Sequence, residues 1–231
     1  MHNSDRVRSR LQRPLHYDYT PERTGRYHPM RTIAQHARLR AQNLGGAEPY
    51  LTLPNMRAYI PAFDSDLRCM IQELMTVKHP AYLRLGYSEQ PSWLVPGPYA
   101  AWRRILPGDG PTVAFEGPLA GAALDAIRES GLNADSWLVS ELPIHRPPPE
   151  FLSSVRRSGY LLVVEEHVSG GGFGQMLACE LLAAGVCPTR FVLRPALGYV
   201  SGLYGSQRFH RKECGLDPES IVSELNHAAH S

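Results

Sequence analysis

The residues with the clearest chemical potential are two acids and a histidine that precede a group of glycines. Glu165, Glu166 and His167 end a strongly apolar stretch, and four of the five residues 170–174 are glycine. In α/β sheets, ligands bind at the carboxyl ends of strands, and a helix N-terminus preceded by glycine can bind an anion through its free N–H groups. Two adjacent carboxylates could also act in acid–base catalysis.

A structural interpretation of this stretch is nevertheless favoured. Its spacing differs from the dinucleotide-binding GxGxxG pattern, and the Lys of a phosphate-binding loop is absent. We therefore interpret the glycines as residues that let a helix pack close to a sheet. Alternation along a strand would point Glu165 and Glu166 to opposite sides, which would leave one of them solvated.

Metal binding and nucleophilic hydrolysis have no positive signal. The histidines His145, His167 and His210 are scattered along the chain. No serine lies in a GxSxG elbow. We expect neither a zinc site nor a catalytic serine.

Arg84 is the second residue with chemical potential. It lies in a short apolar strand between Leu83 and Leu85, directly before Gly86. A buried charge is costly unless it is paired or meets an anion. Two interpretations follow: an internal ion pair with a carboxylate of this chain, or a site for an anionic ligand.

The composition limits the class of protein. The chain has 231 residues, 43% hydrophobic and 20% charged, which allows one large or two small domains with a buried core. A net charge of +2 argues against nucleic acid as a partner. No apolar stretch approaches the roughly 20 residues of a membrane span, and no secretory signal is evident. The four cysteines form no CxxC pair, so we expect reduced thiols in a cytoplasmic protein.

The first 45 residues differ from the rest of the chain. They hold nine Arg, no Lys and three acids, a net charge of about +6, whereas residues 46–231 carry −4. The segment lacks a sustained apolar period, so we predict a basic, disordered head over residues 1–45. Three interpretations stay open: an arm that contacts an acidic or phosphate-bearing partner, a solvated tail without a role, and a segment from a wrong reading frame or start.

From residue 49 onward, strands and helices alternate. The expected strands are 58–60, 81–85, 112–116, 136–140, 160–165 and 189–193. The expected helices begin at Asp64 or Ser65, at Pro118, at Glu150, at Phe173 and at Asp217, which acts as a cap before Pro218. Residues 87–110 are rich in Pro and Gly and are predicted to be a linker, in which three aromatic side chains pack against both flanking units. These aromatic residues are Trp93, Tyr99 and Trp102. The alternation predicts an α/β fold with a largely parallel sheet.

Four stretches together resemble one family of enzymes. LPNM (53–56) with PA (61–62) resembles its "iPNm…P-A-D" segment, and AYLRLG (81–86) resembles its "vYlRLg" strand. VVEEH (163–167) with GGFG (171–174) resembles "vtvEEH…GGlG", and GLDPESI (215–221) resembles its closing helix. The family is the transketolase family of thiamine diphosphate enzymes, and the order and spacing agree over roughly residues 50–225. One departure is Phe63, which stands where the family prefers Asp.

The resemblance implies two units after the head. Residues 46–90 are similar to the last third of the pyrimidine-binding domain. Residues 91–231 are similar to the C-terminal domain, a mixed, mostly parallel sheet flanked by helices. The family's diphosphate-binding domain and its cofactor-activating glutamate have no match. The resemblance implies thiamine diphosphate and Mg²⁺ only in complex with a partner, and none bound by this chain alone.

The implied function is that of a component of a transketolase-type transferase that moves a two-carbon ketol or acyl unit and is inactive alone. Its partners would be an N-terminal transketolase-type subunit, a second copy of the chain, or both, with a phosphorylated, sugar-like substrate. In the family, the arginine that matches Arg84 holds the substrate's phosphate, so Arg84 is the one predicted substrate-binding residue. The alternative function is a non-catalytic assembly or binding module.

Overall fold

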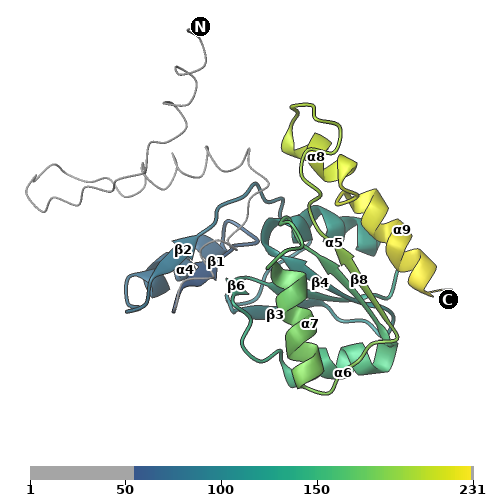
Figure 1. Ribbon diagram of the computed structural model, residues 1–231, viewed down its shortest axis with the longest axis horizontal. Helices are drawn as coiled ribbons and strands as arrows, with labels where there is room; N and C mark the ends of the chain where they lie inside the picture. Colours follow the sequence, from purple (N-terminus) through teal and green to yellow (C-terminus); the bar gives the residue numbers. More distant parts are fainter. Residues whose placement is uncertain (1–54, 230–231) are drawn as a thin grey trace, which may run out of the picture.

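A five-stranded sheet forms the centre of the computed structural model, which describes residues 55–229 (Figure 1). Its order is β3-β5-β4-β7-β8, with β3 antiparallel to β5 and all other pairs parallel. The strands are β3 (Trp102–Leu106), β4 (Thr112–Glu116), β5 (Asp135–Val139), β7 (Tyr160–Val164) and β8 (Arg190–Arg194). The expected mixed, mostly parallel α/β sheet is confirmed.

Helices cover both faces of this sheet. The helices are η1 (Gly117–Leu119), α5 (Ala120–Glu129), α6 (Pro149–Ser158), α7 (Phe173–Ala183), α8 (Gln207–Glu213) and α9 (Pro218–Ala229). α5 and α9 pack on one face and α6 and α7 on the other, which divides the core into two clusters. In β7, Leu162 and Val164 face the first cluster, and Leu161 and Val163 face the second. The unbroken apolar sequence of β7 therefore reflects burial on both faces.

A smaller sheet joins the N-terminal unit to the main domain. Its order is β2-β1-β6, where β1 (Arg57–Tyr59) is parallel to β2 (Ala81–Leu83) and antiparallel to β6 (Glu141–Leu142). β6 lies within the 91–231 stretch, yet it pairs with a strand of the 46–90 stretch. The proposed boundary near residue 90 is therefore crossed by backbone hydrogen bonds.

An ion pair strengthens this junction. α4 (Asp66–Leu74) carries Asp66, which receives two hydrogen bonds from the Arg103 guanidinium of β3, at 2.7 and 2.6 Å. Asp66 also accepts the backbone N–H groups of Ala62 and Phe63. Ser65 stands at the N-cap position but makes no side-chain cap bond, so the predicted side-chain cap at Asp64 or Ser65 is wrong.

The predicted linker over residues 87–110 is wrong in one respect, because it contains β3. Its prolines and glycines lie on either side of that strand, and two adjacent arginines, Arg103 and Arg104, hide the strand pattern. Both arginines are paired with buried acids, Asp66 and Asp135. Of the three linker aromatics, Trp102 packs against the unit that follows the linker: its ring lies at a tilt to that of Phe151, with centroids 4.9 Å apart.

Two further elements, β6 and α8, have no counterpart among the predicted ones. The Asp217 cap of α9 is confirmed, since its Oδ1 accepts the Ser220 N–H at 3.1 Å. The predicted head, residues 1–45, lies outside the described residues. Within residues 55–229, no helix has the length and apolar character needed to cross a membrane.

Candidate functional site

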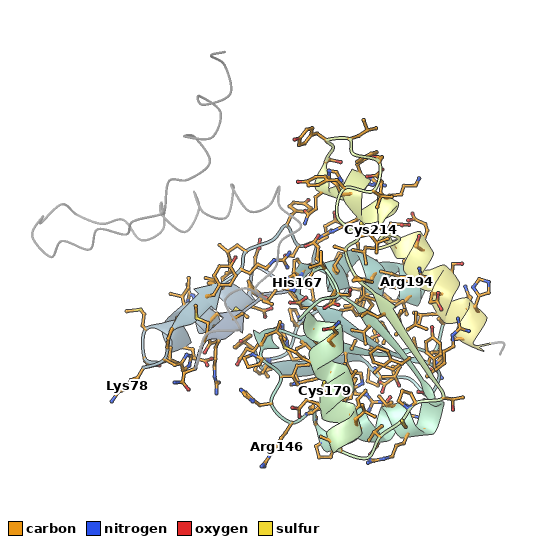
Figure 2. The ribbon with its side chains drawn as sticks, viewed as in Figure 1. Lys78, Arg146, His167, Cys179, Arg194 and Cys214 are labelled. Atoms are coloured by element: carbon orange, nitrogen blue, oxygen red, sulfur yellow. The ribbon has the colours of Figure 1, made fainter. Side chains whose placement is uncertain are left out.

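The candidate site lies where three strands end. β4 ends at Glu116, β7 is followed by Glu165, Glu166 and His167, and β2 is followed by Arg84. The Arg84 N–H donates to the Tyr59 carbonyl at 2.9 Å, which extends the β1–β2 pairing by one residue. Figure 2 places His167 near the junction of the smaller and larger sheets. Residues from both halves of the chain are thus brought together.

Glu166 is the centre of a charged network. Its Oε2 lies 3.3 Å from Arg84 Nη2. Its Oε1 accepts hydrogen bonds from Arg211 Nε and Gln207 Nε2 of α8, each at 2.8 Å. The side chains of Arg84 and Glu166 are only 12% and 5% exposed. Two arginines that are 127 positions apart in the sequence therefore hold one buried carboxylate.

The charge state of Glu166 follows from these contacts. Burial opposes its ionisation, but Arg84, Arg211 and the hydrogen bonds from Arg211 and Gln207 outweigh burial and lower the pKa of its carboxyl below the usual range. Glu166 is therefore a carboxylate at neutral pH. With two guanidinium groups around one carboxylate, the network has a net charge of +1.

The expectation that Glu165 or Glu166 is solvated is wrong, because both are buried. β7 ends at Val164, so strict strand alternation does not continue through these residues. The Glu165 N–H donates to the Arg194 carbonyl of β8 at 3.1 Å, while α8 covers Glu166. Sequence reasoning could not place α8 over this strand end.

The glycines after His167 accommodate Glu165. The Gly174 N–H at the start of α7 donates to Glu165 Oε2 at 3.1 Å. A Cβ at position 172 would lie 2.6 Å from that oxygen, and one at position 174 would collide with Leu193 of β8. This geometry supports the interpretation that the glycines permit close packing. The Gly171 N–H also donates to a side chain of this protein, that of Gln175, at 2.9 Å.

Glu116, Glu165 and His167 form a second, fully buried group. Each offers one ligand atom, and these atoms lie within 4.8 Å of one another. His167 Nδ1 is 3.2 Å from Glu116 Oε2. Burial, together with the positive charge of Arg84, lowers the pKa of His167 well below its usual value, so the imidazole is neutral.

One neutral imidazole and two carboxylates are a donor set that Zn²⁺ or Mn²⁺ accepts. His145 and His210 take no part in this group. What sequence reasoning missed is the pairing of His167 with two glutamates. The available signal was that the two expected strands 112–116 and 160–165, which the structure shows to be neighbours, each end in an acid.

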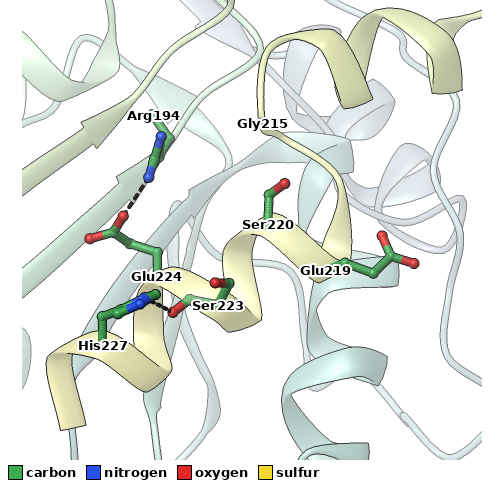
Figure 3. Close-up of a pocket in the computed structure, with 7 residues that line it drawn as sticks. All are labelled: Arg194, Gly215, Glu219, Ser220, Ser223, Glu224 and His227. Carbon is green, nitrogen blue, oxygen red and sulfur yellow. Dashed lines mark hydrogen bonds and ion pairs between the residues drawn. The ribbon is translucent and has the colours of Figure 1, made fainter. Parts of the chain in front are cut away.

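A polar pocket of about 390 Å³ lies between β8 and α9 (Figure 3). It is lined by Arg194, Gly215, Glu219, Ser220, Ser223, Glu224 and His227. Arg194 and Arg190 both pair with Glu224, which also accepts a hydrogen bond from the Tyr160 hydroxyl at 3.1 Å. Because the polar groups at its centre satisfy one another, this pocket is a weaker candidate than the strand ends.

The two interpretations of Arg84 now have different support. Its ion pair with Glu166 is the structural interpretation drawn from the sequence. Contact with a substrate phosphate stays a prediction.

No family model matches this chain. The chain is 32% identical over 189 residues to 1-deoxy-D-xylulose-5-phosphate synthase 2 of Geobacter sulfurreducens, a match that covers 75% of this chain and 29% of that protein. It is 26% identical over 176 residues to one of the subunits of the apulose-4-phosphate transketolase of Actinobacillus succinogenes, covering 73% of this chain and 55% of that protein. The chain thus spans about a third to a half of the length of these relatives.

Solved structures agree with this fold. A split-gene transketolase, described as an inactive beta4 tetramer, superposes with a TM-score of 0.64 at 24% identity, covering 78% of this chain and 60% of that chain. Transketolase from Leishmania mexicana superposes with a TM-score of 0.54 at 14% identity, covering 79% of this chain and 26% of that chain. The fold expected from the sequence resemblance is confirmed.

Proposed function

Since this chain resembles the C-terminal part of transketolase-family enzymes, we propose that it is one component of a thiamine-diphosphate-dependent transferase. The enzyme would move a two-carbon ketol or acyl unit, and a partner subunit would carry the diphosphate-binding domain. The observation that carries this proposal is coverage: three quarters of this chain matches a synthase of which it spans only 29%. A relative named as one subunit of a transketolase supports a division between two polypeptides.

The described residues do not fit the cofactor. Thiamine diphosphate with Mg²⁺ needs an accessible anion site beside oxygen ligands. The one three-ligand group found among residues 55–229, Glu116 with Glu165 and His167, is fully buried. Near the start of α7, the N–H groups of Gly174 and Gly171 already donate hydrogen bonds to this protein's own Glu165 and Gln175. We therefore propose that the cofactor is held by the partner.

This chain's proposed contribution is to shape the substrate side of the assembled site. Glu166 holds Arg84 and Arg211 beside the exit of β2, and their surplus positive charge suits a phosphorylated, sugar-like substrate. The support for direct contact between Arg84 and phosphate is the family resemblance. The support from geometry is limited to the fixed position of the guanidinium.

The test begins with affinity purification of the full-length tagged chain from its native host. We expect a second polypeptide, similar to the N-terminal part of the relatives, to co-purify at a fixed ratio. Ketol transfer would then be assayed with thiamine diphosphate and Mg²⁺ for the complex and for the chain alone. Activity in the complex only is expected. Activity of the chain alone, or the absence of such a polypeptide, would contradict the proposal.

A further inference from the structure

The stretch from Leu197 to Phe209, here called the 197–209 segment, exposes an unusual amount of apolar surface. Every residue from 199 to 206 is exposed. Leu203 and Tyr204 are 61% and 94% exposed, and Leu197 and Val200 are also exposed. Soluble proteins rarely expose several large apolar side chains next to one another unless that surface binds a partner or ligand.

The segment has a defined shape. The rings of Tyr199 and Tyr204 lie 6.0 Å apart, and Tyr199 contacts the buried His210 edge-on at 5.1 Å. His210 Nε2 accepts the Gly205 N–H at 3.2 Å, and Ser206 caps α8 by accepting the Phe209 N–H. Side chains held in place before association lose less conformational entropy on binding, which favours a recognition surface.

The helix that follows the segment, α8, contacts the end of the N-terminal unit. Arg211 of α8 donates to the backbone carbonyl of Tyr87 at 3.3 Å and to Glu166 at 2.8 Å. The side chain of Tyr87 is exposed as well. In Figure 1, α8 and the loop before it lie at the end of the molecule opposite α6. The Arg211 hydrogen bonds therefore tie α8 to the chain just after β2, where the resemblance to the pyrimidine-binding domain ends.

The charge beside the segment indicates what kind of partner fits it. α8 exposes Arg208 and Lys212, whereas its one acid, Glu213, lies 3.6 Å from His210. In a two-fold dimer through this surface, both copies would bring the same basic residues, Arg208 and Lys212, to the interface, and like charges there are unfavourable. The surface of a different protein, with an apolar centre and acidic edges, would be complementary to the 197–209 segment and to the basic residues of α8.

We propose that the 197–209 segment is the docking surface for the proposed partner subunit that carries the diphosphate-binding domain. This inference rests on the proposed function, and it adds the place and chemistry of the contact. The relatives extend well beyond the region that this chain matches. The proposed partner would correspond to that remaining part of the relatives.

The experiment compares two leucine variants of the full-length chain. Leu203→Glu places a charge in the proposed surface, and Leu182→Glu is the matched control because Leu182, on α7, is 65% exposed. Both variants should melt like the wild type. Affinity for the co-purified partner should fall about thirtyfold or more for Leu203→Glu, the loss typical of a central interface residue, and should be unchanged for Leu182→Glu.

A charge variant tests the partner's chemistry. Arg208→Glu should also weaken the complex, and the affinity of the wild type should fall as salt is added. Tighter binding of the partner by Arg208→Glu would contradict the proposal that the partner's surface has acidic edges.

The outcomes separate the two proposals. If the partner binds Leu203→Glu as tightly as the wild type, the docking surface is wrong while the proposed function stands. If sedimentation shows self-association that only Leu203→Glu abolishes, the occupant is a second copy and the inference is overturned. If no partner co-purifies, the proposed function fails first and the inference fails with it.

Discussion

Replacing Arg84 by methionine tests whether the charged network at the strand ends stabilises the fold. Methionine keeps an unbranched stem and removes the guanidinium. The lost contact is the 3.3 Å pair with Glu166, which retains Arg211 and Gln207 as partners. Removing one partner of a buried ion pair can destabilise a fold by about 3–5 kcal/mol. Because Glu166 keeps two partners, we expect a smaller loss of about 1.5–3 kcal/mol, the range for a hydrogen bond to a charged group.

The assay is thermal and urea unfolding of the full-length chain. For a protein of this size, each kcal/mol lowers Tm by about 2–4 °C. Arg208→Met is the control, because Arg208 is exposed on α8, and its effect should stay within about 0.5 kcal/mol. Arg84→Met combined with Glu166→Gln should be less destabilising than the sum of the two single changes, since the removed groups interact.

Kinetics of the assembled complex test the substrate prediction. Arg84→Lys keeps the charge but loses the planar, two-pronged donor. If Arg84 holds a substrate phosphate, kcat/KM should fall about fivefold to 150-fold for a phosphorylated acceptor, equivalent to about 1–3 kcal/mol, and little for an unphosphorylated one. Equal losses for both acceptors with a lowered Tm would assign Arg84 to structure alone. An unchanged Tm for Arg84→Met would refute the ion-pair reasoning.

Three further predictions concern the same region. His167 is buried and its pKa is depressed in the folded chain, so the unfolded chain takes up the proton first as the pH falls. The free energy of unfolding should therefore be at its full value above about pH 6.5 and decline below it, by at most about 1.4 kcal/mol per pH unit. In urea unfolding, His167→Gln should flatten this decline, whereas the control His227→Gln should not. Gly174→Ala should lower unfolding stability by about 1–3 kcal/mol because its Cβ would meet Leu193, whereas Gly170→Ala, with no atom within 4 Å of its Cβ, should be neutral; equal effects would contradict the packing argument. Calorimetry of the isolated chain should show no binding of thiamine diphosphate with Mg²⁺, and micromolar affinity would disprove assignment of the cofactor to a partner.

Local patterns in the amino-acid sequence were enough to predict the order of most elements and the family resemblance. Residues 112–116 were expected to form a strand and do so, and the unbroken apolar sequence of residues 160–164 is typical of a strand buried on both faces. These features are local, because alternation, capping and chain-breaking residues act within a few positions. The Asp217 cap was readable for the same reason.

Which charges meet depends on the tertiary structure. Arg84 and Arg211 are 127 positions apart, yet both contact Glu166. β3 was hidden because Arg103 and Arg104 look solvent-exposed until Asp66 and Asp135 are placed beside them. A side chain's partner depends on how strands are ordered and which helix covers them. Such long-range packing leaves no trace in local spacing, and for that reason the buried Glu116–Glu165–His167 group emerged only from the fold.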